Sequence, residues 1–452
     1  MKVSATDVIL HAFDWSYATV AQHAQQISRA GYKAVLISPP MRSLSSPKGT
    51  PWWQRYQPQD YRVIDNQLGN TDDFKTMSEA LHKEGLWLYV DVVFNHMANE
   101  STQRLDLDYP SEAVLAHYRK HHKRYERWRL FGDLSKPLFE ECDFIEPFGI
   151  KDWHDKWEVQ NGRITGGPHD QGLPTLKSCP HVIEQQQAYL RALKGLGVNG
   201  FRIDAAKHMT IDHLNAVWDE DICQDVHIFG EIITDGGASK EEYELFLAPY
   251  LEKTNLSAYD FPLFLTLYQS LMDDGDLSSL VDPYCFGLAL SKYRAITFTI
   301  THDIPNNDVF RSLVMEPWQE HLAYAYILGR DGGVPLVYSD LNTSGIENDG
   351  QPRWQNAWQR DEMIAQIEFH NRMHSLPMIS IITEEKLLVF SRGDQGIVVL
   401  NSSEDPRQFT IEWQKNVSDI ITGALFPAQE SSLVLEVQGR SCLMLVDAPK
   451  NQ

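Results

Sequence analysis

Four short stretches of the sequence combine carboxylates, histidines and an arginine in patterns that suit acid–base chemistry. They read DVVFNH from residue 91, GFRIDAAKH from residue 200, FGE from residue 229 and THD from residue 301. Each lies at the end of a short apolar run of the kind that forms a buried strand. Any one of them alone is as easily a buried ion pair or a helix cap. Because all four occur in order along one chain, we treat them together as a candidate catalytic site.

The second and third stretches contain two carboxyl groups whose surroundings should differ. Side chains two residues apart on a strand share a face, so Arg202 and Asp204 point the same way. The guanidinium should lower the pKa of Asp204 and keep it ionised, as a nucleophile at a sugar carbon requires. Glu231 follows the apolar run His-Ile-Phe-Gly, where desolvation and neighbouring carboxylates should keep it protonated. A carboxylate nucleophile and a protonated acid together are the groups that glycoside hydrolysis uses.

Eight apolar runs, separated by stretches with helical periodicity, would position these groups. We predict strands over residues 8–13, 34–38, 86–94, 198–204, 226–231, 256–261, 295–301 and 334–338. Helices are expected over 71–84, with Thr71 as the N-cap, and over 182–196. This alternation predicts the α/β class and a (β/α)8 TIM barrel, whose functional groups lie at the C-terminal ends of the strands.

Two regions interrupt the alternation and indicate further domains. Residues 97–180 are rich in Trp, His, Asp, Pro and Gly, and they are too long for an ordinary loop, so we expect an inserted domain after the third strand. Residues 377–452 contain short alternating strands that indicate a C-terminal antiparallel β-sandwich. The barrel would then comprise residues 1–96 and 181–376.

The four stretches, in this order and spacing, resemble the signature regions of the α-amylase family of retaining glycoside hydrolases. The segment PWWQRYQP from residue 51, together with GFRIDAAKHM, is similar to animal-type members in particular. The resemblance implies that Asp204 is the nucleophile, Glu231 the general acid and base, and Asp303 a stabiliser of the transition state. It implies an α-glucan substrate, contacted by the following residues: Trp52, Trp53, Tyr56, Gln57, His96, Arg202, Lys207, His208 and His302. Of these, Tyr56 would stack on the sugar at the cleavage point, and Lys207 and His208 would contact the leaving-group side.

The resemblance also raises the question of calcium and chloride. Asn95 and His208 match calcium ligands of the family, but Thr175 stands where an aspartate ligand is expected, and calcium prefers carboxylate oxygens. Calcium binding is therefore open, with Asp143 or Asp170 as compensating ligands. We do not expect chloride, because Thr301 replaces the asparagine that would help to bind it.

Composition limits the partners of this 452-residue chain. Asp and Glu total 62 against 40 Lys and Arg, so the net charge is −22, which disfavours binding to nucleic acid or to an anionic membrane. No apolar run is long enough to span a membrane. The five cysteines form no C-x-x-C pair, and only Cys142 and Cys179 are considered as a disulfide if the protein is exported. We expect a monomer that is cytoplasmic as the sequence stands, because no signal peptide is visible, or secreted if the sequence is a trimmed mature form.

Three alternatives to an endo-acting α-1,4-glucan hydrolase remain at this stage. A glucanotransferase or an exo-acting enzyme would use the same groups with another acceptor or another substrate end. A catalytically inactive barrel is disfavoured because all three acids are present. A metal-dependent barrel hydrolase needs a His-x-His pair at the end of the first strand, where only His11 is found.

Overall fold

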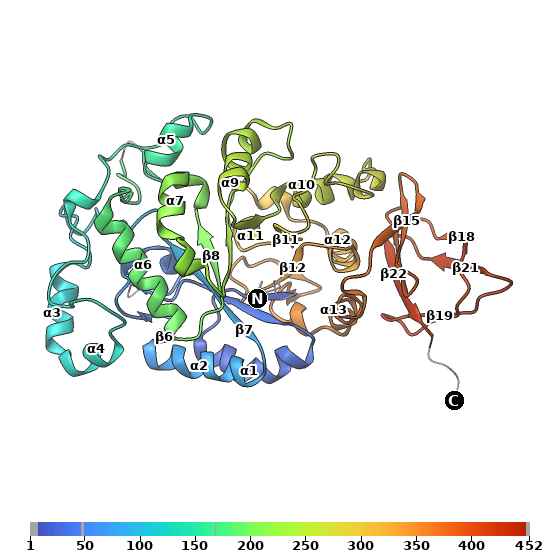
Figure 1. Cartoon of the computed structure of the whole chain (residues 1–452), viewed down its shortest axis with the longest axis horizontal. Helices are drawn as coiled ribbons and strands as arrows, with labels where there is room; N and C mark the ends of the chain where they lie inside the picture. Colours follow the sequence, from blue (N-terminus) through green and yellow to red (C-terminus); the bar gives the residue numbers. More distant parts are fainter. Residues whose placement is uncertain (1–7, 47–48, 168, 449–452) are drawn as a thin grey trace.

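The centre of the molecule is a closed barrel of eight parallel strands, as the sequence predicts (Figure 1). The computed structural model describes residues 8–46, 49–167 and 169–448. Around the barrel the strand order is β1, β12, β11, β10, β9, β8, β7 and β2. Their bounds are β1 Ile9–Ala12, β2 Ala34–Ile37, β7 Trp87–Val93, β8 Gly200–Asp204, β9 His227–Gly230, β10 Ser257–Tyr259, β11 Ala295–Phe298 and β12 Val334–Ser339. Nearly every residue in these strands is buried, which explains why the runs are apolar and β-branched.

Helices cover the outside of the barrel. In chain order they are α1 Tyr17–Arg29, α2 Thr71–Lys83, α6 Pro180–Gly195, α7 Ile211–Val217, α8 Glu220–Cys223, α9 Ala248–Lys253, α10 Phe261–Ser270, α11 Asp303–Asn306, α12 Pro317–Gly329 and α13 Asp361–Met373. Short helical turns occur at η1 Trp52–Tyr56, η2 Glu141–Asp143, η3 Ala206–His208, η4 Tyr243–Leu247, η5 Leu277–Leu280, η6 Arg311–Leu313 and η7 Ala357–Gln359. Three small hairpins complete the loops: β3 Arg42–Ser43 with β4 Pro58–Asp60, β5 Asp65–Asn66 with β6 Gly69–Asn70, and β13 Glu347–Asn348 with β14 Gln351–Pro352.

The start of α2 differs by one residue from the sequence prediction. Asn70, and not Thr71, is the N-cap: its side chain accepts from the backbone N–H groups of Asp72 and Asp73. The Asp73 carboxylate accepts in return from the Asn70 backbone, which completes a capping box. Thr71 is buried inside the helix, and its hydroxyl donates to the Trp128 carbonyl. The tertiary contact of Thr71 therefore decided which of the two capping residues begins the helix.

Between β7 and α6 the chain leaves the barrel and forms α3 Glu112–Lys120, α4 His122–Trp128 and α5 Lys156–Asn161. This segment lies at one side of the barrel in Figure 1, with α5 on the side towards which β8 points. An isolated β-bridge pairs His96, just after β7, with Thr175, and a second bridge pairs Phe144 with Leu176 within the segment. The first bridge brings the inserted segment against the end of β7, where two predicted site residues lie.

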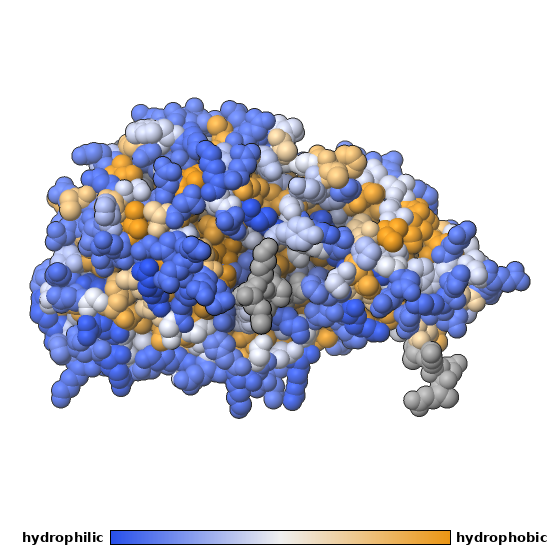
Figure 2. Space-filling model, in the orientation of Figure 1, coloured by the Kyte–Doolittle hydropathy of each residue, from blue (hydrophilic) through white to orange (hydrophobic). Residues whose placement is uncertain are grey.

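The C-terminal part of the chain forms two antiparallel sheets, in agreement with the predicted β-sandwich (Figure 1). One sheet contains β15 Met378–Thr383, β16 Leu387–Arg392, β17 Gly396–Asn401, β22 Ser441–Asp447, β19 Val417–Asp419 and β20 Leu425–Phe426. The other pairs β18 Arg407–Glu412 with β21 Ser432–Val437. A separate apolar core lies between the sheets, and α12 packs against β17 and β22. Figure 2 shows a mostly hydrophilic face with an apolar patch close to β15, where Ile379 and Ile381 are exposed.

The structure also shows the state of the cysteines and the length of the apolar helices. All five cysteines are free, and Cys179 Sγ lies 3.9 Å from a carboxylate oxygen of Asp143 and forms no bond to Cys142. Within the described ranges, no helix is both long and apolar enough to cross a membrane.

Candidate active site

The register of three neighbouring strands brings the predicted acids together. Between β7 and β8, Asp91 lies opposite Arg202 and Val93 opposite Asp204. Between β8 and β9, Ile203 lies opposite Gly230, so Glu231 follows the end of β9 beside Asp204. Because the strands are parallel, their C-terminal ends meet at one face of the barrel.

Arg202 connects the acids of this face. The side chain is fully buried, and its Nη1 donates to Asp91 Oδ2 at 2.6 Å and to Asp204 Oδ1 at 2.9 Å. Its Nη2 donates to Glu231 Oε1 and lies 3.8 Å from Asp303 Oδ2. One guanidinium therefore connects the predicted nucleophile to the predicted acid, which places the two carboxyl groups close to each other.

The pKa of Asp204 differs from the sequence prediction. Arg202 does act to lower the pKa of Asp204, and His96 acts in the same direction, but burial outweighs both and raises this pKa above its ordinary value. The prediction left out burial, because a strand pattern does not show how completely water is excluded. Burial raises the pKa of Glu231 to about 8; Arg202 opposes this shift, and the neighbouring Asp303 adds to it. Glu231 is therefore mostly protonated at neutral pH, as a general acid must be.

The turn after β8 holds Glu231 in place. Ala205 adopts a left-handed conformation with φ of 49°, which is uncommon for a residue other than glycine. In this conformation its backbone N–H donates to Glu231 Oε2 at 3.1 Å. Backbone strain of this kind persists where the surrounding structure enforces it, and here it orients the acid.

An aromatic wall borders the acids. The His302 ring stacks on Tyr56 at 5.0 Å and on Phe13 at 4.5 Å, and it is buried, which lowers its pKa and keeps it neutral. Trp52 meets Tyr56 and His302 edge-on, whereas Trp53 is 43% exposed. The structure thus places Trp52, Tyr56 and His302 together and leaves Trp53 open to solvent on the same turn, η1.

Two of the predicted substrate contacts already have protein partners. The Nε2–H of His96 donates to the Tyr56 carbonyl at 3.0 Å, and its Nδ1 accepts from the Asn95 amide at 3.3 Å. The side-chain oxygen of Gln57 accepts from the backbone N–H of Asn99 at 3.0 Å. Both residues lie in the site, and their hydrogen bonds connect η1 to the beginning of the inserted segment.

The predicted leaving-group side is built by η3 and the inserted segment. Lys207 Nζ donates to Glu242 at 2.8 Å, and the Lys207 backbone N–H donates to the Glu231 carbonyl at 3.2 Å. The His208 ring donates through Nδ1 to the Val159 carbonyl of α5 at 2.9 Å. Trp153, which precedes α5, meets the His208 ring edge-on at 5.8 Å and remains 46% exposed.

Sequence reasoning assigned no role to two residues of this site. Asp91 is buried and accepts hydrogen bonds from both Arg202 and the Tyr56 hydroxyl, the latter at 2.9 Å. Its signal was a charge in the middle of the apolar strand WLYVDVV. Trp153 carried no comparable signal, because only the tertiary structure brings the inserted segment against His208.

The predicted calcium ligands do not form a carboxylate-rich site. Thr175 is buried, and its hydroxyl donates to the Gly162 carbonyl at 3.0 Å, while the Asn95 amide nitrogen bonds to the His96 ring. In the described part of the chain, no three His, Cys, Asp or Glu side chains gather in a way that could hold a metal ion. Thr175 therefore leaves the surroundings of Asn95 and His208 without the carboxylate oxygen that calcium prefers at this position.

The two carboxylates considered as compensating ligands have other partners. Asp143 accepts from the backbone N–H of Glu140 at 2.9 Å. Asp170 accepts from the side chain of Asn99 at 2.6 Å and from the backbone N–H of Gly172. These carboxylates stabilise turns of the inserted segment.

The surroundings of Arg202 do not fit a chloride ion either. Both terminal nitrogens of its guanidinium bind carboxylates, with Asp91 and Asp204 on one nitrogen and Glu231 on the other. Thr301, which stands in the asparagine position, is buried, and its hydroxyl finds no partner among the described residues. A bound anion would face these carboxylates at short range and be repelled.

A (β/α)8 barrel that carries three acids and an aromatic wall at the ends of its strands has the site of a glycoside hydrolase. A family model described as "Alpha amylase, catalytic domain" matches residues 16–244. An α-amylase of Aeromonas hydrophila is 46% identical over 96% of this chain and 92% of that protein. The chain belongs to the α-amylase family.

Two solved structures show the same fold at lower sequence identity. The α-amylase I of Eisenia fetida superimposes with a TM-score of 0.79 at 20% identity and covers 98% of this chain and 97% of its own. A cyclomaltodextrin glucanotransferase with a three-domain arrangement gives a TM-score of 0.73 at 17% identity and covers 98% of this chain and 99% of its own.

Proposed function

We propose that this protein is an endo-acting α-amylase that hydrolyses α-1,4-glucosidic bonds of starch, glycogen or malto-oligosaccharides with retention of the anomeric configuration. The observation that carries the proposal is the contact of one guanidinium, Arg202, with both Asp204 and Glu231. Retaining enzymes separate their two carboxyl groups by only roughly 5–5.5 Å, whereas inverting enzymes leave room for a water molecule at roughly 6.5–9.5 Å. Two carboxyls on one guanidinium favour the shorter spacing.

The first step needs a proton donor and a nucleophile. Glu231, with a pKa of about 8, holds a proton at neutral pH and donates it to the glycosidic oxygen as the bond to the leaving chain breaks. The ionised form of Asp204 attacks the anomeric carbon and forms a covalent glycosyl ester. Arg202 stabilises the negative charge of Asp204 before the attack.

In the second step Glu231 acts as a base, and Asp204 becomes the leaving group. Glu231, now ionised, takes a proton from water, and the resulting hydroxide displaces Asp204 from the anomeric carbon. Because both displacements invert the configuration, the product retains it. Asp303, within 3.8 Å of Arg202, would accept hydrogen bonds from sugar hydroxyls and stabilise the positive charge of the transition state.

The aromatic wall and the leaving-group side would hold the glucan. Tyr56 and the exposed Trp53 present ring faces and edges that suit the apolar C–H faces of sugar rings. Lys207, His208 and Trp153 would contact the sugar units that leave. The net charge of −22 supports a neutral glucan and no nucleic acid as the partner, and we infer a monomer that needs neither calcium nor chloride.

The test is a time course of products and of their anomeric form. Maltoheptaose and soluble starch should yield mixtures of shorter oligosaccharides whose first-formed anomer, followed by proton NMR, is α. A first-formed β-anomer would refute retention. Release of a single product from one chain end would refute endo-action.

Transfer to a sugar is the alternative outcome of the same intermediate. The exposed Trp153 beside His208 gives an acceptor sugar a surface on which to bind. In the maltoheptaose experiment, products longer than the substrate would show that a sugar, and not water, resolves the intermediate. We propose hydrolysis as the main reaction.

A further inference from the structure

The aromatic wall is built from distant parts of the chain, and one of them has little regular structure of its own. Trp52 and Tyr56 belong to η1, a single 3₁₀ turn that follows Pro51 without a side-chain cap. Such turns form poorer hydrogen bonds than an α-helix, so a short one depends on tertiary contacts. Tyr56 has such a contact, because its hydroxyl donates to Asp91 at 2.9 Å. The beginning of the turn, which carries Trp52, needs an anchor of its own.

Arg55 supplies this anchor. Its side chain is 1% exposed, and its guanidinium donates to both carboxylate oxygens of Asp14, from Nε at 2.7 Å and from Nη2 at 2.9 Å. The same Nη2 donates to the carbonyl of Thr50, which precedes the turn, at 2.9 Å. A two-pronged contact between a guanidinium and a carboxylate fixes direction as well as distance. One side chain thus connects both η1 and the segment before it to Asp14.

Asp14 is itself held in a fixed position. It lies just after β1, and its backbone N–H donates to the hydroxyl of Ser38, just after β2, at 3.0 Å. Its φ of 59° lies in the left-handed region, which aspartate adopts more readily than most residues other than glycine. Burial raises the pKa of Asp14 to about 6, and the Arg55 guanidinium opposes this rise, so the carboxylate is mostly ionised at pH 7. The ion pair therefore joins η1 to two strands of the barrel at neutral pH.

Phe13, the residue before Asp14, extends this contact into the site. Its ring centre lies 5.6 Å from that of Trp52, and it stacks on His302 at 4.5 Å. His302 in turn stacks on Tyr56 at 5.0 Å. A shift of η1 away from β1 would separate the two rings of the turn from these partners and change the surface offered to a glucan.

The ion pair does not contact the groups that carry out the chemistry. Within the described ranges, neither of its residues forms a hydrogen bond or an ion pair with Asp204, Glu231 or Asp303. Loss of the pair should therefore change chiefly how well the glucan is held, and much less how fast the bound glucan reacts.

We propose that the Asp14–Arg55 ion pair positions the aromatic wall for the glucan, by holding η1 against the C-terminal end of β1. Both are positioning residues, since they act through Trp52 and Tyr56 and need not touch the substrate. This inference rests on the proposed function, because the wall is assigned there to glucan binding.

Two variants remove the ion pair in different ways. Asp14→Asn keeps the size of the side chain and removes its charge, which leaves a buried guanidinium without its partner and can also impair folding. The double variant Asp14→Asn with Arg55→Gln removes both charges, so that neither is left buried alone. In both variants we expect KM for maltoheptaose to rise about tenfold and kcat to change less than about threefold. Arg55→Lys keeps the charge without the two-pronged contact, and its KM should lie between those of the double variant and the unmodified protein.

Hydrogen exchange reports on the turn without any substrate. In the full chain, mass spectrometry of the peptide over residues 50–57 should show amide exchange at least about tenfold faster in the double variant. A peptide over residues 87–93, which form β7, should exchange as before. Because this measurement needs no cleavage, it tests the anchor separately: a protein that cleaves no α-glucan would refute the proposed function, and unchanged exchange would refute the anchor.

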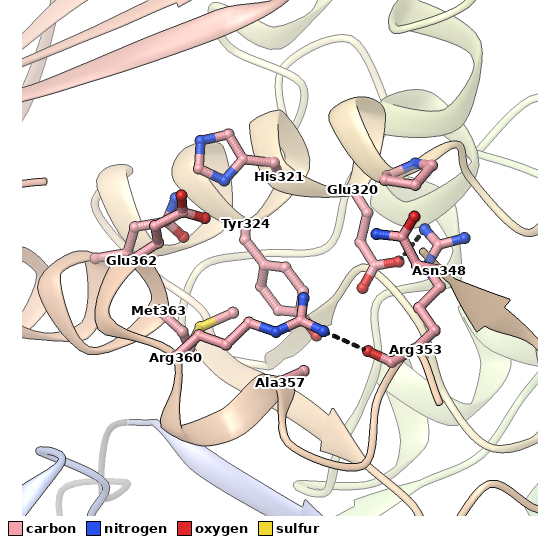
Figure 3. A pocket seen from close by; sticks show the side chains of 11 residues that line it. Glu320, His321, Tyr324, Asn348, Arg353, Ala357, Arg360, Glu362 and Met363 are labelled. Atoms are coloured by element: carbon pink, nitrogen blue, oxygen red, sulfur yellow. Dashed lines mark hydrogen bonds and ion pairs between the residues drawn. The ribbon is translucent and has the colours of Figure 1, made fainter. Parts of the chain in front are cut away.

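A second buried pair of the same kind serves as the control (Figure 3). Glu320 of α12 and Arg353 approach to 2.5 Å in the wall of a pocket. Their side chains otherwise bond to the Met315 carbonyl and to the indole of Trp354, and these residues lie outside the aromatic wall. Glu320→Gln removes one charge of this pair, and it should change neither KM nor the exchange of residues 50–57.

Three results would overturn the proposal. The first is unchanged amide exchange of residues 50–57 in the double variant. The second is an unchanged KM in the double variant, with or without a fall in kcat, when the unmodified enzyme cleaves maltoheptaose. The third is an equal rise of KM in Glu320→Gln, which would show that the loss of any buried ion pair has this effect.

Discussion

Replacement of Glu231 by glutamine keeps the shape of the side chain and removes its proton. With a pKa of about 8, roughly nine in ten molecules carry that proton at pH 7. A positioned general acid contributes about 10²–10⁴-fold, and the same carboxyl acts in both steps of the proposed mechanism. We therefore expect kcat/KM of Glu231→Gln on maltoheptaose to fall by at least about 10⁴-fold.

The pH dependence of the unmodified enzyme follows from the same shift. Glu231 must be protonated to act as the acid, so kcat/KM should decline as the pH rises through about 8. Maltosyl fluoride separates the two functions, because fluoride leaves without a proton. Formation of the glycosyl ester from this substrate, followed with a fluoride electrode, should be impaired much less in the variant than cleavage of maltoheptaose.

The raised pKa of Glu231 also has a consequence for stability. The folded protein holds this proton more tightly than the unfolded chain, whose ordinary value is 4.5, so stability is lost as the pH rises from that value through about 8. At about 1.36 kcal/mol per pKa unit, the loss between pH 5 and pH 9 amounts to about 4 kcal/mol. The Glu231→Gln variant has no such proton, so its free energy of unfolding should not show this part of the decrease between pH 5 and pH 9.

The assay is urea unfolding of the unmodified protein and of the Glu231→Gln variant, each at pH 5 and at pH 9. Other carboxyl groups titrate in both proteins, so the comparison isolates position 231. A stability difference that stays the same at the two pH values would refute the buried, protonated state of Glu231. Cleavage of maltoheptaose by the Glu231→Gln variant at the rate of the unmodified enzyme would refute the role of Glu231 as the acid.

Further predictions concern the nucleophile, the support of Arg202, the leaving-group side and metal ions. Asp204→Asn should abolish turnover and prevent trapping of a glycosyl ester by a 2-deoxy-2-fluoro substrate; a trapped ester on another residue in the mass spectrum would contradict the assignment. Tyr56→Phe removes the hydroxyl that donates to buried Asp91 and should destabilise folding by about 1–3 kcal/mol in urea unfolding, and an unchanged midpoint would count against this hydrogen bond. Trp153→Ala should raise KM for maltoheptaose several-fold and leave maltotriose unaffected, with the exposed Trp157→Ala as the matched control; equal effects of both changes would argue against a specific contact. Addition of EDTA should alter neither the melting temperature nor starch cleavage, and a loss that calcium restores would show a metal site.

The barrel and its acids were predictable because their signals are local. A strand buried on both faces must be apolar, so the polar residues at its end, as in the stretch ending at Asp204, stand out. The C-terminal sandwich was visible in the same way, through short alternating strands. The capping error at α2 arose because Asn70 and Thr71 are both good caps, and the contact of Thr71 with Trp128 decided between them.

The balance of charges in the site was not predictable in the same way. The spacing of Arg202 and Asp204 indicates an ion pair, but four carboxyl groups compete for this one guanidinium, and three of them come from other strands or loops. How far burial shifts each pKa depends on how completely these strands exclude water. No pattern within one strand contains that information.

The sequence by itself determined the class of fold and predicted the order of the domains and the acids of the site, because each depends on residues that are close along the chain. Only the tertiary structure decided that Arg202 connects Asp204 to Glu231 and that Thr175 bonds to the backbone at the expected calcium position. These features depend on contacts between segments that are distant in sequence. Their energies arise from burial and hydrogen bonding, which exist only once the chain is folded.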